Sequence, residues 1–367
     1  MMSNNLGLYI HIPFCRSKCP YCDFFSMRGD EQGFDEYTRI LKNNIRHWGQ
    51  RTDKLVNTIY IGGGTPSVIG ADRISDILCC VRESFSIPDK AEVTMEANPA
   101  SGKFFDFGKV ASFGINRVSL GMQSADSDEL KALGRLHSTE DVISSIKLIR
   151  NAGIQNISLD LMMGIPNQTK DSLRKSIDFC VELGAEHISS YILKIEPGTI
   201  FDKRYDNYNF PDDDETAELY LFAVDYLAEN GYEQYEISNF CKTGFESKHN
   251  LKYWTLEDYL GLGPAAHSFL NGKRFYYKRD LKSFESNITE DEGSGGDAEE
   301  YIMLRLRLRK GLDLRECKKI LGEGFSEKLA AKSQKYIKNN LMELKDNRLF
   351  FTPKGFLVSN SILADLI

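Results

Sequence analysis

The hydrophobic and polar positions of the chain alternate, from residue 8 to about residue 230, between short apolar runs and longer amphipathic segments. Short β-branched runs predict buried strands of a parallel sheet at 8–12, 56–61, 92–97, 117–120, 157–162 and 187–193. Apolar residues at helical spacing predict helices at 34–48, 71–85, 127–133, 139–152, 170–183 and 213–230. Six such repeats predict an α/β fold. A partial (β/α)6 barrel is the most economical form, with functional residues at the carboxyl ends of the strands; an open doubly wound sheet is the alternative.

The repeat ends near residue 240, and the pattern predicts three parts with boundaries at 1–240, 241–297 and 298–367. The middle part carries aromatics and Gly-Pro turns without a clear period, which is typical of a connecting or capping segment. Its acidic, glycine-rich end, 290–297, predicts a flexible loop. The last part predicts helices at 299–309, 313–321 and 326–344 and a strand at 348–352, a small helical domain of the winged-helix kind.

Composition narrows the functional classes. The chain has 367 residues, of which 41% are hydrophobic and 27% charged, as in ordinary globular proteins. A net charge of −7 argues against a dedicated nucleic-acid surface, because such a surface must neutralise phosphates. The amino terminus lacks the pattern of a leader, and no window offers about 20 uninterrupted apolar residues. We therefore expect a cytoplasmic protein. Two basic runs lie at 273–282 and 305–310. They are interpreted as solvated surface, and transient contact with an anionic membrane is the alternative.

Three cysteines stand together directly after the first predicted strand, as C-x3-C-x2-C at Cys15, Cys19 and Cys22. A 4Fe-4S cluster needs four ligand positions, so three thiolates leave one iron open to a ligand from outside the chain. A structural zinc site would need a fourth cysteine or histidine, and only His11 is close by in the sequence. A disulfide framework does not suit a chain of this size without a secretory leader. The spacing therefore favours an iron-sulfur cluster.

A second motif, Tyr60-Ile-Gly-Gly-Gly-Thr-Pro-Ser67, follows the second predicted strand. Glycines at a strand end let backbone amides approach a ligand where a Cβ would clash. The motif lacks the spacing of a dinucleotide or phosphate loop, so alone it indicates no more than a tight turn. Its place beside the cysteine loop gives it weight.

Together the two motifs resemble those of the radical S-adenosylmethionine superfamily, in which S-adenosylmethionine chelates the open iron and the reduced cluster cleaves it. Further segments resemble the coproporphyrinogen III oxidase-like (HemN-type) branch of that superfamily from residue 8 to about 259, and more weakly beyond. They are Tyr9-Ile-His-Ile-Pro-Phe-Cys15, Glu96-Ala-Asn-Pro, Arg117-Val-Ser-Leu-Gly-Met-Gln123, Arg135 and Asp160-Leu-Met-Met-Gly-Ile-Pro.

The resemblance implies a role for individual residues. Cys15, Cys19 and Cys22 would hold the 4Fe-4S cluster. Tyr9, Gly63 and Glu96 would contact one S-adenosylmethionine. The oxidase branch binds a second S-adenosylmethionine, and the matching positions are Tyr21, Gly64, Thr65, Gln123, Arg135 and Asp160. Each of these also has a purely structural interpretation; Arg135 and Asp160, for example, would then form an internal ion pair.

Three departures separate the chain from the oxidases. Phe24 stands where they carry a fourth cysteine, only eight residues precede Tyr9, and His249-Asn-Leu-Lys-Tyr-Trp254 matches the HN-x-x-YW motif of the HemW-like haem chaperones. The resemblance thus implies a chaperone that delivers haem to acceptor proteins, with His249, Tyr253 and Trp254 contacting haem. A neutral imidazole can ligate haem iron, and aromatic faces suit a porphyrin.

Two alternatives stay open at this stage. The motif residues could simply anchor an irregular segment to the barrel. The chain could also be an oxygen-independent coproporphyrinogen III oxidase of porphyrin biosynthesis, so enzymatic activity is not decided by the sequence. A homodimer is likewise left open.

Overall fold

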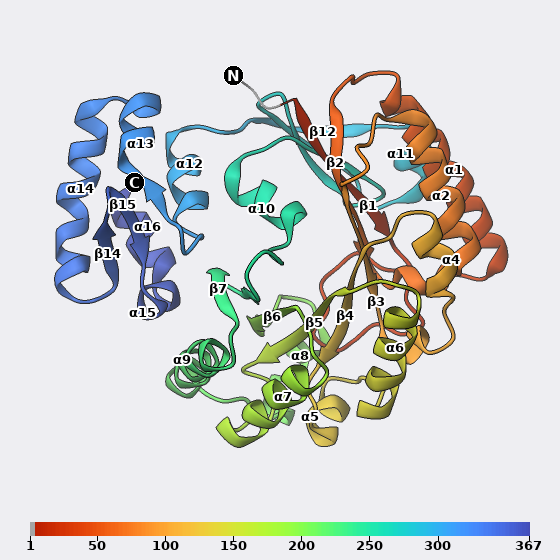
Figure 1. Ribbon diagram of the computed structural model, residues 1–367, viewed down its shortest axis with the longest axis horizontal. Coiled ribbons are helices and arrows are strands. Elements are labelled where there is room, and N and C mark those ends of the chain that lie inside the picture. The colour runs from red at the N-terminus through yellow and green to blue at the C-terminus, as the bar shows by residue number, and fades with distance from the viewer. Residues whose placement is uncertain (1–3) are drawn as a thin grey trace.

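The computed structural model describes residues 4–367, and its core is one large, mostly parallel sheet (Figure 1). Six neighbouring parallel strands follow chain order, as predicted. They are β1 (Asn5–Ile12), β2 (Leu55–Gly63), β3 (Glu92–Ala97), β4 (Arg117–Gln123), β5 (Asn156–Met163) and β6 (His187–Ile192). The predicted α/β fold with a partial barrel is therefore confirmed. The prediction that the amino terminus lacks a leader concerns a segment whose residues 1–3 lie outside the described residues.

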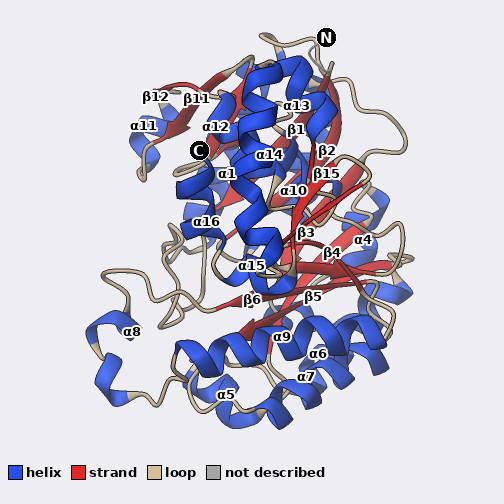
Figure 2. Cartoon of the chain, turned by 90° about the vertical axis from the view of Figure 1, so that its left-hand side faces the viewer, coloured by secondary structure: helices blue, strands red, loops and turns tan. Residues whose placement is uncertain are grey.

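Helices connect the strands and cover the outer face of the sheet. Figure 2 shows α6, α7 and α9 running along one side of the strands. The connecting helices are α1 (Glu31–Gly49), α2 (Ala71–Ser84), α4 (Phe107–Ser112), α6 (Thr139–Asn151), α7 (Lys170–Glu182) and α9 (Asp213–Glu229). Short helices lie after strand ends: η1 (Pro66–Ile69), α3 (Pro99–Gly102), α5 (Ser127–Ala132), α8 (Ile200–Lys203) and η2 (Tyr205–Asn207).

The strands alternate between an apolar face and a polar face, because successive side chains point to opposite sides. In β4, Val118 and Leu120 are buried in the hydrophobic core. Arg117, Ser119 and Gly121 face the inside of the partial barrel and line its cavity. The polar residues that interrupt the apolar strand patterns therefore mark the inner face.

Part of the segment 241–297, predicted as a connecting or capping part, adds strands to the main sheet. It forms α10 (Lys248–Thr255), β9 (Tyr259–Leu262), β10 (His267–Leu270), β11 (Lys273–Tyr277), α11 (Leu281–Glu285) and β12 (Thr289–Ser294). Strand β9 pairs in parallel with β1, and β10, β11 and β12 follow as antiparallel neighbours. The flexible loop predicted at 290–297 is wrong over its first half, because the backbone of β12 pairs with β11. At the other edge, β8 (Asn239–Cys241) and β7 (Glu233–Glu236) flank β6.

The carboxyl-terminal part forms a separate group of helices around a small antiparallel sheet, on the left of Figure 1. Its elements are α12 (Ala298–Arg305), β13 (Leu312–Asp313), α13 (Leu314–Leu321), α14 (Glu323–Lys338), β14 (Met342–Lys345), β15 (Arg348–Phe351), α15 (Pro353–Leu357) and α16 (Ser359–Leu366). The helix predicted at 326–344 is wrong at its end. Asn340 has a φ of 57°, which stops the helix, and residues 342–345 pair with β15. The division of the chain at 240 and 297 stays a prediction.

Among the described residues, no helix is long and apolar enough to cross a membrane.

Candidate functional site

A cavity of about 560 Å³ lies inside the partial barrel, at the carboxyl ends of its strands. Its lining brings together eleven of the residues that the sequence assigns to the cluster and to S-adenosylmethionine. They are Cys15, Cys19, Tyr21, Cys22, Gly63, Gly64, Thr65, Glu96, Gln123, Arg135 and Asp160. Tyr9, His249, Tyr253 and Trp254 do not line it. The cavity has the size of a typical small-molecule site.

The three clustered cysteines are free thiols, partly exposed, on the loop that follows β1. The amide of Cys22 donates to the carbonyl of Cys19 (3.1 Å), and the Cys15 thiol lies 3.6 Å from the Thr65 hydroxyl. Burial raises the pKa of Cys15, while the charge of nearby Arg135 lowers it. Among residues 4–367, no three or more histidine, cysteine or acidic side chains are grouped so that they could hold a single metal ion. Three soft thiols spread around one end of a cavity fit a multi-iron cluster, which is larger than one ion.

The glycine run after β2 packs directly against the cysteine loop. Gly64 donates its amide to the carbonyl of Ile12 (2.8 Å), and a Cβ at Gly64 would come within 2.6 Å of the Phe14 carbonyl oxygen. Gly63 has a φ of 112°, and a Cβ there would collide with the ring of His11. Glycine is therefore required at both positions for the two loops to meet.

Glu96, at the end of β3, is held in the cavity wall by two hydrogen bonds. Its carboxylate accepts from the Tyr60 hydroxyl (2.8 Å) and from the Gly63 amide (3.1 Å). Burial raises the pKa of Glu96 to about 7. A buried carboxylate of this kind gains from a cationic ligand group, because the positive charge replaces lost hydration. Tyr60 carries no signal in the sequence beyond its place next to the glycines.

Of the positions matched to a second S-adenosylmethionine, Gln123 lies on β4, Asp160 on β5 and Arg135 in the loop before α6, and all three line the same cavity. Gln123 accepts a hydrogen bond from Tyr191 (2.9 Å). Asp160 accepts one from Ser119 (2.9 Å), and burial raises the pKa of Asp160. Arg135 donates to Cys19 and Gly121 and Asp160 accepts from Ser119, and within the described part of the chain no ion pair joins Arg135 to Asp160.

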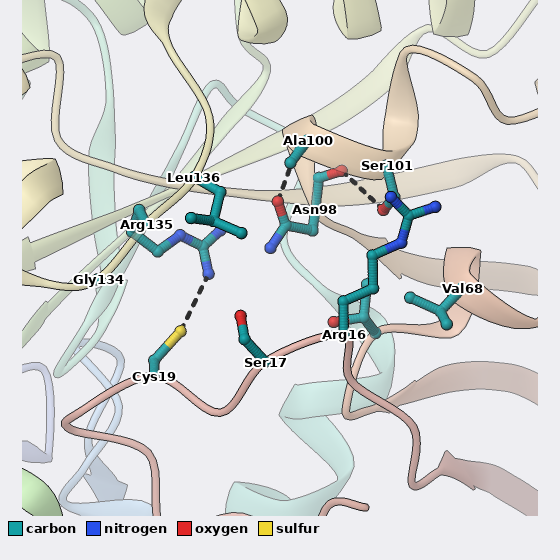
Figure 3. Close-up of a pocket in the computed structure, with 11 residues that line it drawn as sticks. Arg16, Ser17, Cys19, Val68, Asn98, Ala100, Ser101, Gly134, Arg135 and Leu136 are labelled. Carbon is teal, nitrogen blue, oxygen red and sulfur yellow. Dashed lines mark hydrogen bonds between the residues drawn. The ribbon is translucent and has the colours of Figure 1, made fainter. Parts of the chain in front are cut away.

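At the mouth of the cavity, Arg135 donates to the Cys19 thiol (3.8 Å) and to the carbonyl of Gly121 (2.5 Å). Figure 3 shows this contact in a small adjoining pocket of about 50 Å³, where Asn98 caps α3 by accepting from the Ala100 amide. Arg135 thus joins the cysteine loop to β4. Burial raises the pKa of Tyr21, which lies in the same loop.

Tyr9 does not line the cavity, but it is connected through His11 to the cysteine loop. Its hydroxyl is 2.9 Å from Nδ1 of His11, and Nε2 of His11 is 3.0 Å from the carbonyl of Phe25. Burial lowers the pKa of His11 to about 4, so the ring is neutral. The structure thus links Tyr9 through His11 to the far end of the cysteine loop, and His11 orients that loop.

The HN-x-x-YW motif makes up most of α10 and lies against Thr58 of β2 and Glu92 at the start of β3. Nδ1 of His249 is 2.9 Å from the Thr58 hydroxyl, and Nε2 is 2.8 Å from the Tyr253 hydroxyl. The amide of His249 donates to Glu92 (2.9 Å). His249 is fully buried and Trp254 is partly buried. The second motif residue, Asn250, is the one that lines the cavity.

Comparisons with known proteins identify two segments by family models. The model of the radical SAM superfamily matches residues 9–180, and that of the HemN C-terminal domain matches residues 297–358. Among solved structures, coproporphyrinogen III oxidase (HemN) from Escherichia coli superimposes with a TM-score of 0.85 at 20% identity, covering 99% of this chain and 90% of that chain. This likeness confirms the fold.

Curated relatives are similar over the whole length. The heme chaperone HemW of Lactococcus lactis is 33% identical, covering 99% of this chain and 97% of that protein. The heme chaperone HemW of Bacillus subtilis is 34% identical, covering 96% and 97%. That of Escherichia coli is 39% identical over 71% of this chain and 69% of that protein. The chain therefore belongs to the HemW family of the radical SAM superfamily.

Proposed function

We propose that the protein is a cytoplasmic haem chaperone, which binds haem and delivers it to haem-accepting proteins. One observation carries this proposal: the proteins that match it over nearly their whole length, at 33–34% identity, are named heme chaperones. The exposed Phe24, in the position where the oxidases carry a further cysteine, supports it as well.

The cysteine loop would hold a 4Fe-4S cluster through Cys15, Cys19 and Cys22. Such a cluster supplies single electrons. The residues around it suit S-adenosylmethionine as the second cofactor. Gly63 allows close approach of the backbone, and Glu96 offers a buried carboxylate to a cationic group. A second S-adenosylmethionine would use Tyr21, Gly64, Thr65, Gln123, Arg135 and Asp160.

The proposal includes haem contact through His249, Tyr253 and Trp254, but ligation of the iron by His249 would need a change in structure. Both ring nitrogens of His249 already have internal partners. Burial lowers the pKa of His249 to about 3, so its imidazole is neutral and chemically able to ligate iron. Haem ligation by His249 therefore requires α10 to move away from β2.

The oxygen-independent coproporphyrinogen III oxidase is the second candidate function. The observation behind it is the shared fold, because HemN superimposes over 99% of this chain. At 20% identity that similarity reports the fold, and it does not carry over the reaction.

The test uses anaerobically reconstituted protein in two parallel assays. Haem titration followed by absorbance should give a saturable complex. Incubation with coproporphyrinogen III, S-adenosylmethionine and a reductant should give no protoporphyrinogen. Turnover without a haem complex would overturn the chaperone proposal and establish the oxidase.

Matched histidine variants locate the haem contact. His249→Ala should weaken haem binding, whereas His47→Ala, an alteration on the outer helix α1, should not. His267→Ala tests a further histidine as a haem ligand; this side chain is more than one-third exposed and pairs with Glu292 (3.1 Å). Unchanged haem affinity in folded His249→Ala would remove this residue from the haem site. Elution volume with and without haem tests whether a homodimer forms.

A further inference from the structure

Three neighbouring strands, β3, β4 and β5, each carry a polar side chain with an unsatisfied buried atom, and the three residues lie side by side near the amino ends of these strands. Thr94 on β3, Arg117 on β4 and Asn156 on β5 are in register with one another. Thr94 Oγ1, Arg117 Nε and Asn156 Oδ1 are each buried without a hydrogen bond. Buried polar atoms are nearly always satisfied in folded proteins. A row of three unsatisfied atoms therefore indicates that something else fills their hydrogen bonds.

Arg117 is the centre of this row and the largest fully buried side chain of the described part. It is 2% exposed and lines the cavity. No side-chain hydrogen bond or ion pair of Arg117 is formed with any of residues 4–367. A guanidinium is always charged in proteins, and leaving it buried and unpaired is costly. The carboxylates of Glu96 and Asp160 interact with this charge across the cavity without forming an ion pair, and the open space of the cavity leaves room for a directly bound anion.

The surroundings of Arg117 select the kind of anion. Asn250 of α10 lines the same cavity and offers an amide. The carboxylates of Glu96 and Asp160 also line it, although neither forms an ion pair with Arg117. Two nearby negative charges repel a dianion such as phosphate more strongly than a monoanion. The planar fork of a guanidinium matches the two oxygens of a carboxylate.

We propose that Arg117 and Asn250 form a carboxylate-binding subsite at the inner end of the cavity, which takes a small monocarboxylate. Arg117 is the first residue of β4 and Gln123 the last, so the two lie at opposite ends of that strand. None of the positions matched to S-adenosylmethionine includes Arg117 or Asn250. We therefore expect the subsite to stay available when S-adenosylmethionine is bound, and the probe experiment below includes that condition.

The probe for this subsite is 3,3,3-trifluoropropionate, observed by ¹⁹F NMR with anaerobically reconstituted full-length protein. The wild type should broaden and shift the probe signal in a saturable way, both without and with S-adenosylmethionine. Propionate should reverse the effect. Propionamide, which has the same shape without the charge, should not.

Variants test the two named residues. Arg117→Gln should weaken probe binding by at least about tenfold, because it removes a charge-assisted hydrogen-bond pair. Asn250→Asp should weaken it similarly by adding a negative charge. Arg117→Lys keeps the positive charge but not the planar guanidinium, so its affinity for the probe should lie between those of the wild type and Arg117→Gln. Arg39→Gln, which changes an exposed arginine paired with Glu285 on the outside, should bind like the wild type.

Thermal melting checks that each variant is folded, and Asn250→Asp carries the test if Arg117→Gln is not. No probe binding to the wild type would overturn the proposal and leave ordered water as the filling of the row. Equal binding by folded Arg117→Gln or Asn250→Asp, or equal competition by propionamide, would also overturn it. Displacement of the probe by S-adenosylmethionine would show that the subsite is not separate.

Discussion

Nδ1 of His249 lies 2.9 Å from the hydroxyl of Thr58, and this contact connects the HN-x-x-YW motif to β2. The ring of His249 also packs on Tyr60, with ring centroids 5.4 Å apart. Tyr60 in turn donates to Glu96 in the cavity wall (2.8 Å). The motif is thus in contact with a residue that supports the candidate S-adenosylmethionine site, and changes in the motif reach both.

His249→Ala is expected to destabilise the fold as well as to affect haem. It removes hydrogen bonds to Thr58 and Tyr253 and leaves a cavity in a fully buried position. We expect a loss of about 2–4 kcal/mol in the free energy of unfolding. Tyr253→Phe removes one hydrogen bond and should cost about 1 kcal/mol. Urea unfolding measures both, and a loss below about 0.5 kcal/mol for His249→Ala would contradict the buried placement.

Gly63→Ala is expected to disrupt the site. The new Cβ would collide with His11, and the φ of 112° is strained for alanine. We expect the variant to lose S-adenosylmethionine binding, measured by calorimetry, and to lose cluster iron. Gly153→Ala is the matched control, since Gly153 also has a positive φ of 86° but no atom lies within 4 Å of the added Cβ. It should cost about 1 kcal/mol and leave binding intact. Equal effects of the two variants would contradict the clash.

Binding of S-adenosylmethionine is expected to strengthen as the pH rises from 6 to 8. Burial raises the pKa of Glu96 to about 7, so part of the free protein carries this carboxyl protonated near neutral pH. A cationic ligand group favours the ionised carboxylate and lowers this pKa, so binding releases a proton. Calorimetry in two buffers of different ionisation enthalpy measures that release. Glu96→Gln should flatten the pH dependence; an unchanged slope would exclude Glu96 as its source.

Phe24→Cys is expected to leave the cofactor content unchanged. Phe24 is 69% exposed, so its replacement should alter stability by no more than about 0.5 kcal/mol. Cys15, Cys19 and Cys22 remain the cluster ligands, and iron analysis should give the wild-type value. The variant should still form no protoporphyrinogen. Gain of that activity would mean that one side chain separates the chaperone from the oxidase.

The sequence predicts the core of the fold well where strands are buried on the helix side. It fails where tertiary pairing overrides the local pattern. Residues 289–294 are acidic and largely exposed, yet they form β12 because the edge of β11 pairs with them. Residues 342–345 continue a helical composition, but Asp346 and Asn347, with φ of 51° and 62°, make the tight turn of a hairpin.

The candidate site shows the same division. The cysteine and glycine motifs are local, so their meeting in one cavity could be expected from two adjacent strands. The setting of His249 depends on Thr58, 191 residues earlier in the chain, and no local pattern reports that contact. Arg117 was visible only as part of a family segment. That Arg117 Nε has no hydrogen-bond partner becomes evident only when the neighbouring strands are placed beside it.

The most direct test of the account is one stoichiometric measurement on anaerobically reconstituted protein. Non-haem iron and acid-labile sulfide are determined on the same sample that is titrated with haem. The account predicts about four irons and four sulfides per chain, retained throughout, together with a saturable haem complex. Absence of a saturable haem complex in protein with an intact cluster would contradict it.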